Sequence, residues 1–152
     1  METKWVIYVD GSSTKKNGGA GILLITPNGK ELSSSLRLEF KTTNNEAEYE
    51  AVIVGLGMAL ELGAKSVEVQ RDSQVIVGHI RGEFEAKEEN MKMYLSKVHN
   101  MQSSFKKFCI TKILRQDNEK ADHLARMAFA ENMEAEEGKE PIHSLTHPSI
   151  FD

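Results

Sequence analysis

The segment WVIYVD, from Trp5 to Asp10, is the stretch on which the predicted fold depends. It is a short run of apolar, β-branched and aromatic residues, which is typical of a buried central strand. The run ends in the carboxylate of Asp10 and is followed by the loop GSSTKKNGG at 11–19. Because α/β sheets bind ligands outside the carboxyl ends of their strands, this segment predicts both the centre of a sheet and the edge of a site.

Four more strands are expected around this first one. Residues 20–26 and 30–40 are separated by the sequence PNG at 27–29, a strong hairpin signal, so the first three strands should form an antiparallel meander. Residues 66–71 (SVEVQR) alternate apolar and polar side chains as a half-buried strand does, and residues 108–114 predict the fifth strand.

Helical periodicity begins at Asn45, where apolar residues recur at spacings of three and four until Gly63. Gly55 and Gly57 lower the helix propensity of this segment, so we expect them to allow close approach of the helix to the sheet. Thr43 or Asn44 is the expected cap. Three other segments have helical patterns: 74–80, 87–105, and a final helix that starts near residue 118 and runs to about residue 131. The predicted fold class is α/β, a five-stranded mixed sheet with antiparallel first three strands and helices on both faces.

The length of 152 residues and the hydrophobic fraction of 39% predict one globular domain, which we place at residues 1–133. The acidic and then Pro- and His-containing residues 134–152 show little periodicity and are expected to form a C-terminal tail or linker. The sequence contains no apolar run of the roughly 20 residues that cross a bilayer and no secretory signal. We therefore expect no membrane association and an intracellular protein, cytoplasmic or nuclear and not secreted. The single cysteine, Cys109, lies in an apolar stretch and is expected to be buried.

The net charge of −4 argues against a protein that holds nucleic acid by bulk electrostatics. Any nucleic-acid site must therefore be local. Acidic residues also gather where divalent cations bind, so each of them has to be weighed by position.

Four carboxylates stand at positions that the predicted fold brings together: Asp10, Glu48, Asp72 and Asp122. Each also has an ordinary explanation: Asp10 as part of a turn, Glu48 as a solvated helix residue, Asp72 as a helix cap and Asp122 as an exposed residue of an amphipathic helix. Two of them end strands, however, and the other two come from the beginnings of helices that can pack over those strand ends. The predicted topology therefore favours one cluster of four carboxylates.

Four ionised carboxylates at short range repel one another strongly, so cations must neutralise them. Oxygen ligands without nearby histidine or cysteine favour a hard ion such as Mg²⁺ or Mn²⁺ over zinc. The chemistry expected of such a site is metal-assisted phosphoryl transfer.

The motifs around these carboxylates resemble type 1 ribonuclease H, in particular the archaeal-like branch found in plant LTR-retrotransposon polyproteins. They span nearly the whole chain, in the family's order: YVDGSS at 8–13, TTNNEAEYEA at 42–51, VQRDSQ at 69–74 and RQDNEKADHLA at 115–125. The resemblance implies a ribonuclease H-like fold and an endonuclease that cuts the RNA strand of RNA/DNA hybrids.

The resemblance also implies roles for individual residues. The four carboxylates would hold two Mg²⁺ ions, with Mn²⁺ as a possible substitute, at the scissile phosphate. One ion would activate the attacking water and the other would stabilise the departing 3′-oxygen, which leaves 5′-phosphate and 3′-hydroxyl ends. Residues expected to contact the 2′-hydroxyls along the minor groove are Gly11, Ser12, Asn44, Asn45 and Gln74. Thr43 would contact a DNA phosphate, and Arg115 and Asn118 would contact the substrate from the loop before the last helix.

The sequence departs from the family pattern in two places. Many members carry a histidine shortly before the last aspartate, whereas this loop reads RQDN at 115–118. The region that is a basic protrusion in some relatives reads RGEFEAKEEN at 81–90 and is acidic. We therefore expect slow turnover and a weak, salt-dependent affinity for the hybrid. A fused or associated reverse transcriptase would deliver the substrate to this domain, which we expect to be a monomer.

Two other functions remain open from the sequence. One is a catalytically weak or inactive connection or nucleic-acid-binding domain of a retroelement polyprotein. The other is a nuclease or integrase of the same broad fold that acts on DNA. The pair Asn44-Asn45 and Gln74 argue against DNA as the substrate, because DNA offers them no 2′-hydroxyl.

Overall fold

The computed structural model describes residues 4–128 and 142–151. The strands, α-helices and 3₁₀ turns along the chain are β1 (Lys4–Ser13), β2 (Gly18–Ile25), β3 (Glu31–Leu38), α1 (Asn44–Glu61), β4 (Ser66–Arg71), α2 (Gln74–Arg81), α3 (Glu89–Gln102), β5 (Lys107–Lys112), η1 (Arg115–Asn118), α4 (Glu119–Met127), β6 (Ile142–Leu145) and η2 (Ser149–Phe151). The helix predicted at 87–105 is shorter at both ends. The predicted extension of the last helix to about residue 131 lies outside the described residues.

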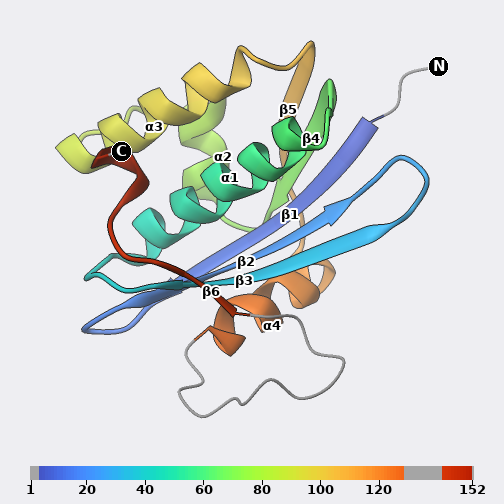
Figure 1. Ribbon diagram of the computed structural model, residues 1–152. Helices are drawn as coiled ribbons and strands as arrows, with labels where there is room; N and C mark the ends of the chain where they lie inside the picture. Colours follow the sequence, from blue (N-terminus) through green and yellow to red (C-terminus); the bar gives the residue numbers. More distant parts are fainter. Residues whose placement is uncertain (1–3, 129–141, 152) are drawn as a thin grey trace.

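One mixed sheet organises these elements, in the strand order β5-β4-β1-β2-β3-β6. β1, β2 and β3 are antiparallel to their neighbours in the meander, whereas β4 pairs parallel with both β1 and β5. Helices α1, α2 and α3 lie on one face and α4 lies on the other (Figure 1). The structure confirms the predicted α/β class, and it corrects the strand number, since six strands replace the expected five.

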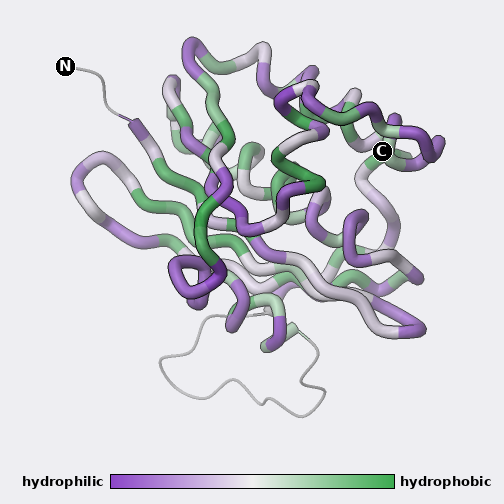
Figure 2. The backbone as a smooth tube through the Cα atoms, turned by 180° about the vertical axis from the view of Figure 1, so that it is seen from behind, coloured by the Kyte–Doolittle hydropathy of each residue, from purple (hydrophilic) through white to green (hydrophobic). Residues whose placement is uncertain are grey.

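Burial follows from the sequence pattern of the strands. β2 (GGAGILLI) is buried along almost its whole length because helices cover both of its faces, which explains its continuous apolar character. β4 instead alternates, with Val67 and Val69 facing the core. Hydrophobic stretches run through the centre of the molecule and hydrophilic stretches mark its loops (Figure 2). The core therefore lies between the sheet and its helices.

The C-terminal residues depart from the predicted tail. β6 pairs parallel with β3 and supplies the sixth strand, and the turn η2 then reaches α3. The backbone N–H of Ser149 donates to Glu50 Oε2 at 3.0 Å, and Lys97 Nζ donates to the Ser149 carbonyl at 2.5 Å. Tyr94 donates to the same buried glutamate at 2.6 Å. Residues 142–151 therefore pack as part of the domain, and the predicted boundary at 133 lies outside the described residues.

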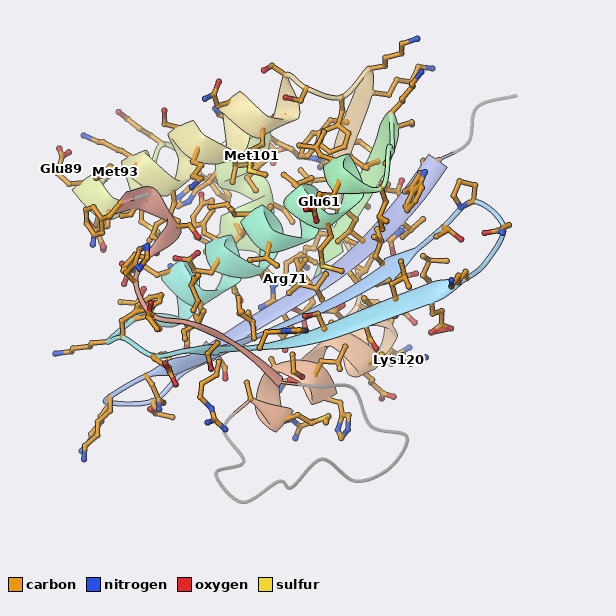
Figure 3. All side chains as sticks on the ribbon, in the orientation of Figure 1. Glu61, Arg71, Glu89, Met93, Met101 and Lys120 are labelled. Atoms are coloured by element: carbon orange, nitrogen blue, oxygen red, sulfur yellow. The ribbon has the colours of Figure 1, made fainter. Side chains whose placement is uncertain are left out.

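The two glycines of α1 serve different purposes. A β-carbon on Gly55 would lie 2.9 Å from Ile7 Cγ2, so this glycine does allow close approach to the sheet, as predicted. The same prediction is wrong for Gly57, where the nearest atom to an added β-carbon is Met101 Cε at 3.9 Å. Met101 belongs to α3 and lies between that helix and α1 (Figure 3).

Replacing Gly57 by alanine is expected to raise the free energy of unfolding by about 0.5–1 kcal/mol, because alanine has the higher helix propensity and the site has room for a methyl group. Urea unfolding followed by circular dichroism measures the effect. The matched variant Gly55→Ala should change stability in the opposite direction, because its methyl group meets Ile7. Equal effects of the two variants would contradict this account of the α1–sheet contact.

Cys109 differs from its expected environment. It lies on β5, a strand at the edge of the sheet, and is exposed, because its side chain faces away from the core. The thiol donates to Glu68 Oε1 at 3.5 Å. Among the described residues, no helix has the length and apolar character needed to cross a bilayer.

Candidate active site

Asp10 lies where two neighbouring strands of the sheet separate. The parallel pairing of β1 with β4 ends at Tyr8 and Gln70, whereas β1 continues with β2 as far as Ser13. Asp10 therefore lies inside β1, and the prediction that it ends a strand needs this correction. It nevertheless lies beyond the last residue of β1 that pairs with β4, and Asp72 follows β4 directly. This geometry explains why the two carboxylates share one edge.

Two glycines bring the helices that carry the other carboxylates close to the sheet. A β-carbon on Gly11 would lie 2.4 Å from the backbone nitrogen of Glu48, so α1 packs directly on β1 at this point. A β-carbon on Gly21 would lie 2.1 Å from the Ala121 carbonyl oxygen, so α4 packs equally closely on β2. Gly21 is the partner of Asp10 in the strand register. Both contacts place a helix carboxylate near Asp10.

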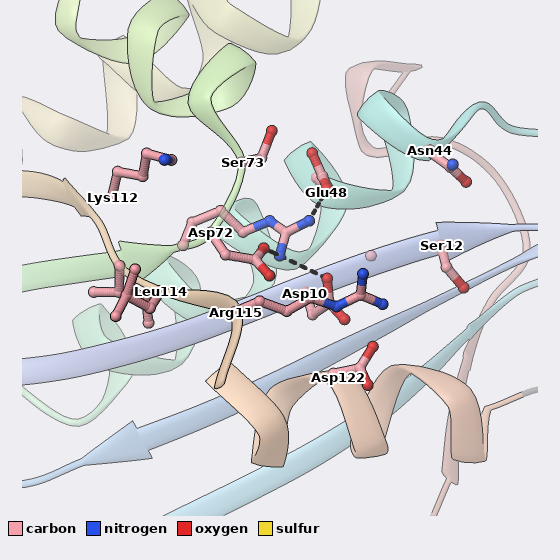
Figure 4. A pocket seen from close by; sticks show the side chains of 13 residues that line it. Asp10, Ser12, Asn44, Glu48, Asp72, Ser73, Lys112, Leu114, Arg115 and Asp122 are labelled. Atoms are coloured by element: carbon pink, nitrogen blue, oxygen red, sulfur yellow. Dashed lines mark hydrogen bonds and ion pairs between the residues drawn. The ribbon is translucent and has the colours of Figure 1, made fainter. Parts of the chain in front are cut away.

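All four predicted carboxylates line one open pocket of about 520 Å³ at this edge. Figure 4 shows Asp122 reaching it from α4 on one side, and Glu48 from α1 on the other. Asp10 and Glu48 are buried, with 7% and 6% of their surfaces exposed. Other predicted site residues that line the pocket are Gly11, Ser12, Asn44 and Arg115.

Arg71, the last residue of β4, lies among these carboxylates. Its Nη1 lies 2.7 Å from Asp10 Oδ1 and also pairs with Asp72, while its Nη2 pairs with Glu48. Asp122 pairs instead with Arg126, one turn further along α4, at 2.5 Å. The guanidinium therefore contacts three of the four carboxylates, and its single positive charge offsets only part of their negative charge.

The charges of the pocket shift the pKa values of its members. Burial is the main cause that raises the pKa of Asp10 to about 6. Arg71 acts in the opposite direction and lowers this pKa, whereas Asp122 raises it. Burial also lowers the pKa of Arg71, which Asp10 opposes. Both shifts show that the fold places these charges where water solvates them poorly.

Two further cations, Lys112 and Arg115, line the pocket from the end of β5 and the turn η1. On the opposite side, the Asn44 side-chain oxygen accepts from the backbone N–H of Ser13 at 2.8 Å and from its hydroxyl at 2.7 Å. The amide oxygen of Asn44 is therefore engaged, and its NH₂ group is the part left to donate to a ligand.

Four predicted substrate residues do not line this pocket. Thr43 caps α1, and its hydroxyl accepts from the Glu46 backbone N–H at 3.1 Å in a capping box. Asn45 and Gln74 are exposed in the first turns of α1 and α2. Asn118 is buried, and its Nδ2 donates to the Val9 carbonyl at 2.9 Å. This hydrogen bond connects η1 to Val9, the residue of β1 directly before Asp10.

Two charged residues that line the pocket, Arg71 and Lys112, were not predicted from the sequence. For Arg71 a signal exists, because it has the same strand parity as Val67 and Val69 and must face inward with them. A buried arginine beside an aspartate indicates an internal ion pair. Lys112 offers no comparable signal, since a lysine at the end of an edge strand is ordinary.

The donor set of the pocket suits a hard divalent ion. Its four carboxylates provide oxygen ligands only, and Glu48 Oε2 is a buried oxygen without a hydrogen-bond partner. In the described part of the chain, no group of three or more acidic, histidine or cysteine side chains is already spaced to hold a metal ion. The ligands are therefore of the right kind, and three of them pair with Arg71.

Known proteins resemble this chain in sequence over most of its length. The family described as "Reverse transcriptase-like" matches residues 8–128. The chain is 28% identical to Ribonuclease HI of Halobacterium salinarum over 80% of this chain and 62% of that protein. It is 30% identical to a bifunctional protein of Mycobacterium tuberculosis over 83% of this chain and 35% of that protein. The chain thus spans less than two thirds of the length of these relatives.

Solved structures of similar fold include RNase H1 of H. salinarum, with a TM-score of 0.78 and 26% identity over 82% of this chain and 96% of that one. The N-terminal RNase H domain of an M. tuberculosis protein has a TM-score of 0.76 and 30% identity, over 82% of this chain and 97% of the solved chain. An RNase H1 known as LC11, solved in complex with an RNA/DNA hybrid, has a TM-score of 0.73 and 30% identity, over 81% of this chain and 94% of the solved chain.

Proposed function

Because the chain belongs to the reverse transcriptase-like family, we propose that it is a ribonuclease H, an endonuclease that hydrolyses the RNA strand of RNA/DNA hybrids. The observation that carries the proposal is the convergence of four carboxylates from β1, α1, the end of β4 and α4 on one pocket. Similar chains named RNase H1 support it, and one of them was solved with a hybrid.

We propose that Asp10, Glu48, Asp72 and Asp122 hold two divalent ions, Mg²⁺ or Mn²⁺. When bound, such ions supply the Lewis-acid charge that activates water and stabilises the leaving oxygen of an in-line displacement. The chain itself contributes the close packing that keeps Glu48 and Asp122 near Asp10. The products would be 5′-phosphate and 3′-hydroxyl ends.

RNA is recognised in this proposal by groups that detect the 2′-hydroxyl. Asn44 offers its NH₂ group as a donor, since Ser13 engages its oxygen, and the Gly11 and Ser12 backbone lies beside it in the pocket. Asn45 and Gln74 would contact the same strand from outside the pocket, and Thr43 would contact a phosphate of the DNA strand.

Phosphate binding falls to Lys112 and Arg115, the two cations at the pocket's side that are not held by the carboxylate cluster. Two contacts make a small electrostatic contribution, so hybrid affinity should be weak and should fall with salt. We propose that the domain belongs to the archaeal-like branch and works as a monomer inside cells. A fused or associated retroelement reverse transcriptase would there deliver the hybrid.

A second function, a catalytically weak or inactive nucleic-acid-binding domain, is favoured by one observation. Three of the four carboxylates are already paired with Arg71. If this pairing persisted on the substrate, the same fold would bind nucleic acid without cutting it.

Incubation with an end-labelled RNA/DNA hybrid in Mg²⁺ is expected to give internal RNA fragments, at least about a hundredfold faster than any cleavage of duplex DNA of the same sequence. EDTA should abolish the cleavage. Duplex RNA serves as the second substrate control. An intact hybrid at high enzyme concentration and low salt, with the hybrid bound in a filter assay, would replace the enzyme proposal by the binding domain.

A further inference from the structure

Arg71 is a buried cation whose pairing is incomplete. The residue is 6% exposed, and its two terminal nitrogens face three carboxylates. Its Nε has no hydrogen-bond partner, although the atom is buried. Glu48 Oε2, in the same cluster, also lacks one. A permanent structural ion pair is stable when its remaining donors and acceptors are satisfied, and this one leaves two of them unsatisfied.

The oxygen atoms that Arg71 engages belong to the carboxylates that would bind metal. Asp10 Oδ1, Glu48 Oε1 and Asp72 Oδ1 all face the guanidinium. A guanidinium and a divalent ion a few ångströms apart repel each other, and arginine cannot relieve this by losing its proton. Occupancy by one cation therefore disfavours the other.

We propose that Arg71 is a resident counter-cation that holds the carboxylates together in the metal-free protein and competes with divalent ions for them. It is a positioning residue, since it acts on the metal site through the carboxylates. The proposal rests on the proposed function in one respect, the assignment of these carboxylates as metal ligands. It implies that metal-free protein is stable and that metal binding carries the cost of displacing a cation.

The proposal makes opposite predictions for stability and for metal binding. In Arg71→Gln, the metal-free protein should melt at a lower temperature, because buried carboxylates lose their counter-charge. The same variant should bind Mn²⁺ at least about tenfold more tightly, since no cation has to be displaced. Its melting temperature should therefore rise more on adding metal than that of the unchanged protein. A purely structural arginine would lower stability and leave metal affinity unchanged.

The test is a calorimetric titration of Mn²⁺ into the full chain without nucleic acid, with metal-dependent melting curves beside it. Arg81→Gln is the matched control, because Arg81 is exposed, pairs with Glu83 at 3.6 Å and lies outside the pocket. Arg71→Lys keeps the positive charge and should keep the Mn²⁺ dissociation constant within about threefold. An Arg71→Gln variant that binds Mn²⁺ no more tightly than the unchanged protein overturns the proposal.

A second measurement needs no variant to fold. In the unchanged protein, NMR of arginine side chains during an Mg²⁺ titration should show the guanidinium of Arg71 losing its carboxylate partners. A signal that stays constant while the carboxylates titrate with Mg²⁺ contradicts competition. Neither measurement uses hybrid cleavage, so competition with metal and the absence of nuclease activity can be told apart.

Discussion

Replacing Asp10 by asparagine is expected to slow hybrid cleavage by about a thousandfold or more while the protein stays folded. The variant removes a buried carboxylate of the pocket. Metal-ion stabilisation of a transition state amounts to several kcal/mol, and about 1.4 kcal/mol corresponds to each factor of ten in rate. Single-turnover cleavage of an end-labelled hybrid in Mg²⁺ measures the loss.

Stability should not fall with activity in this variant. Burial raises the pKa of Asp10 to about 6, so the folded protein disfavours its negative charge at neutral pH. A neutral amide of nearly the same shape removes that cost, and the melting temperature in EDTA should equal or exceed that of the unchanged protein. Such a divergence of activity from stability is expected of a catalytic group.

Asp117→Asn is the matched control, since Asp117 is exposed on η1 and does not line the pocket. It should cleave hybrid at a rate close to that of the unchanged protein. An Asp10→Asn variant with more than a tenth of normal activity would remove Asp10 from the metal site. A large drop in its melting temperature would instead assign the residue a structural role.

The sequence predicted the parts of the fold that depend on local pattern. The alternation in β4, the hairpin at PNG and the helical spacing of α1 are properties of neighbouring residues, and each appears in the structure. β6 was missed because its four residues have no local strand signal, and their pairing with β3 joins segments about a hundred residues apart. Such a strand depends on tertiary contacts alone.

The site was predicted to a similar extent and for similar reasons. The convergence of carboxylates follows from strand ends and helix starts, which the chain order largely determines. Strand parity turns Arg71 inward, but which carboxylates its side chain contacts depends on how α1 and β1 pack around the end of β4, and that is not a local property of the sequence. Asn118 was predicted to contact the substrate, but its side-chain amide donates to the β1 backbone and does not line the pocket.

The second large effect is expected at Gly21, which lies opposite Asp10 in the sheet and beneath α4. A β-carbon there would meet the Ala121 carbonyl oxygen at 2.1 Å and the Ala125 nitrogen at 2.6 Å. These are backbone atoms of a helix, so no side-chain rotation relieves the overlap. Gly21→Ala should lower the free energy of unfolding by about 1–3 kcal/mol or more, measured by urea unfolding, because the core is overpacked.

Activity should fall in the same variant, although Gly21 does not line the pocket. α4 has to move away from β2 to admit the methyl group, and it carries Asp122 with it. A displacement of about 1 Å at a reacting group can cost roughly a hundredfold in rate, so hybrid cleavage should slow by about that factor under conditions where the protein is fully folded. Gly57→Ala, the same change in the helix that carries Glu48, should leave the rate unaltered. If Gly21→Ala were folded and fully active, the close packing of α4 on β2 would not be what positions Asp122.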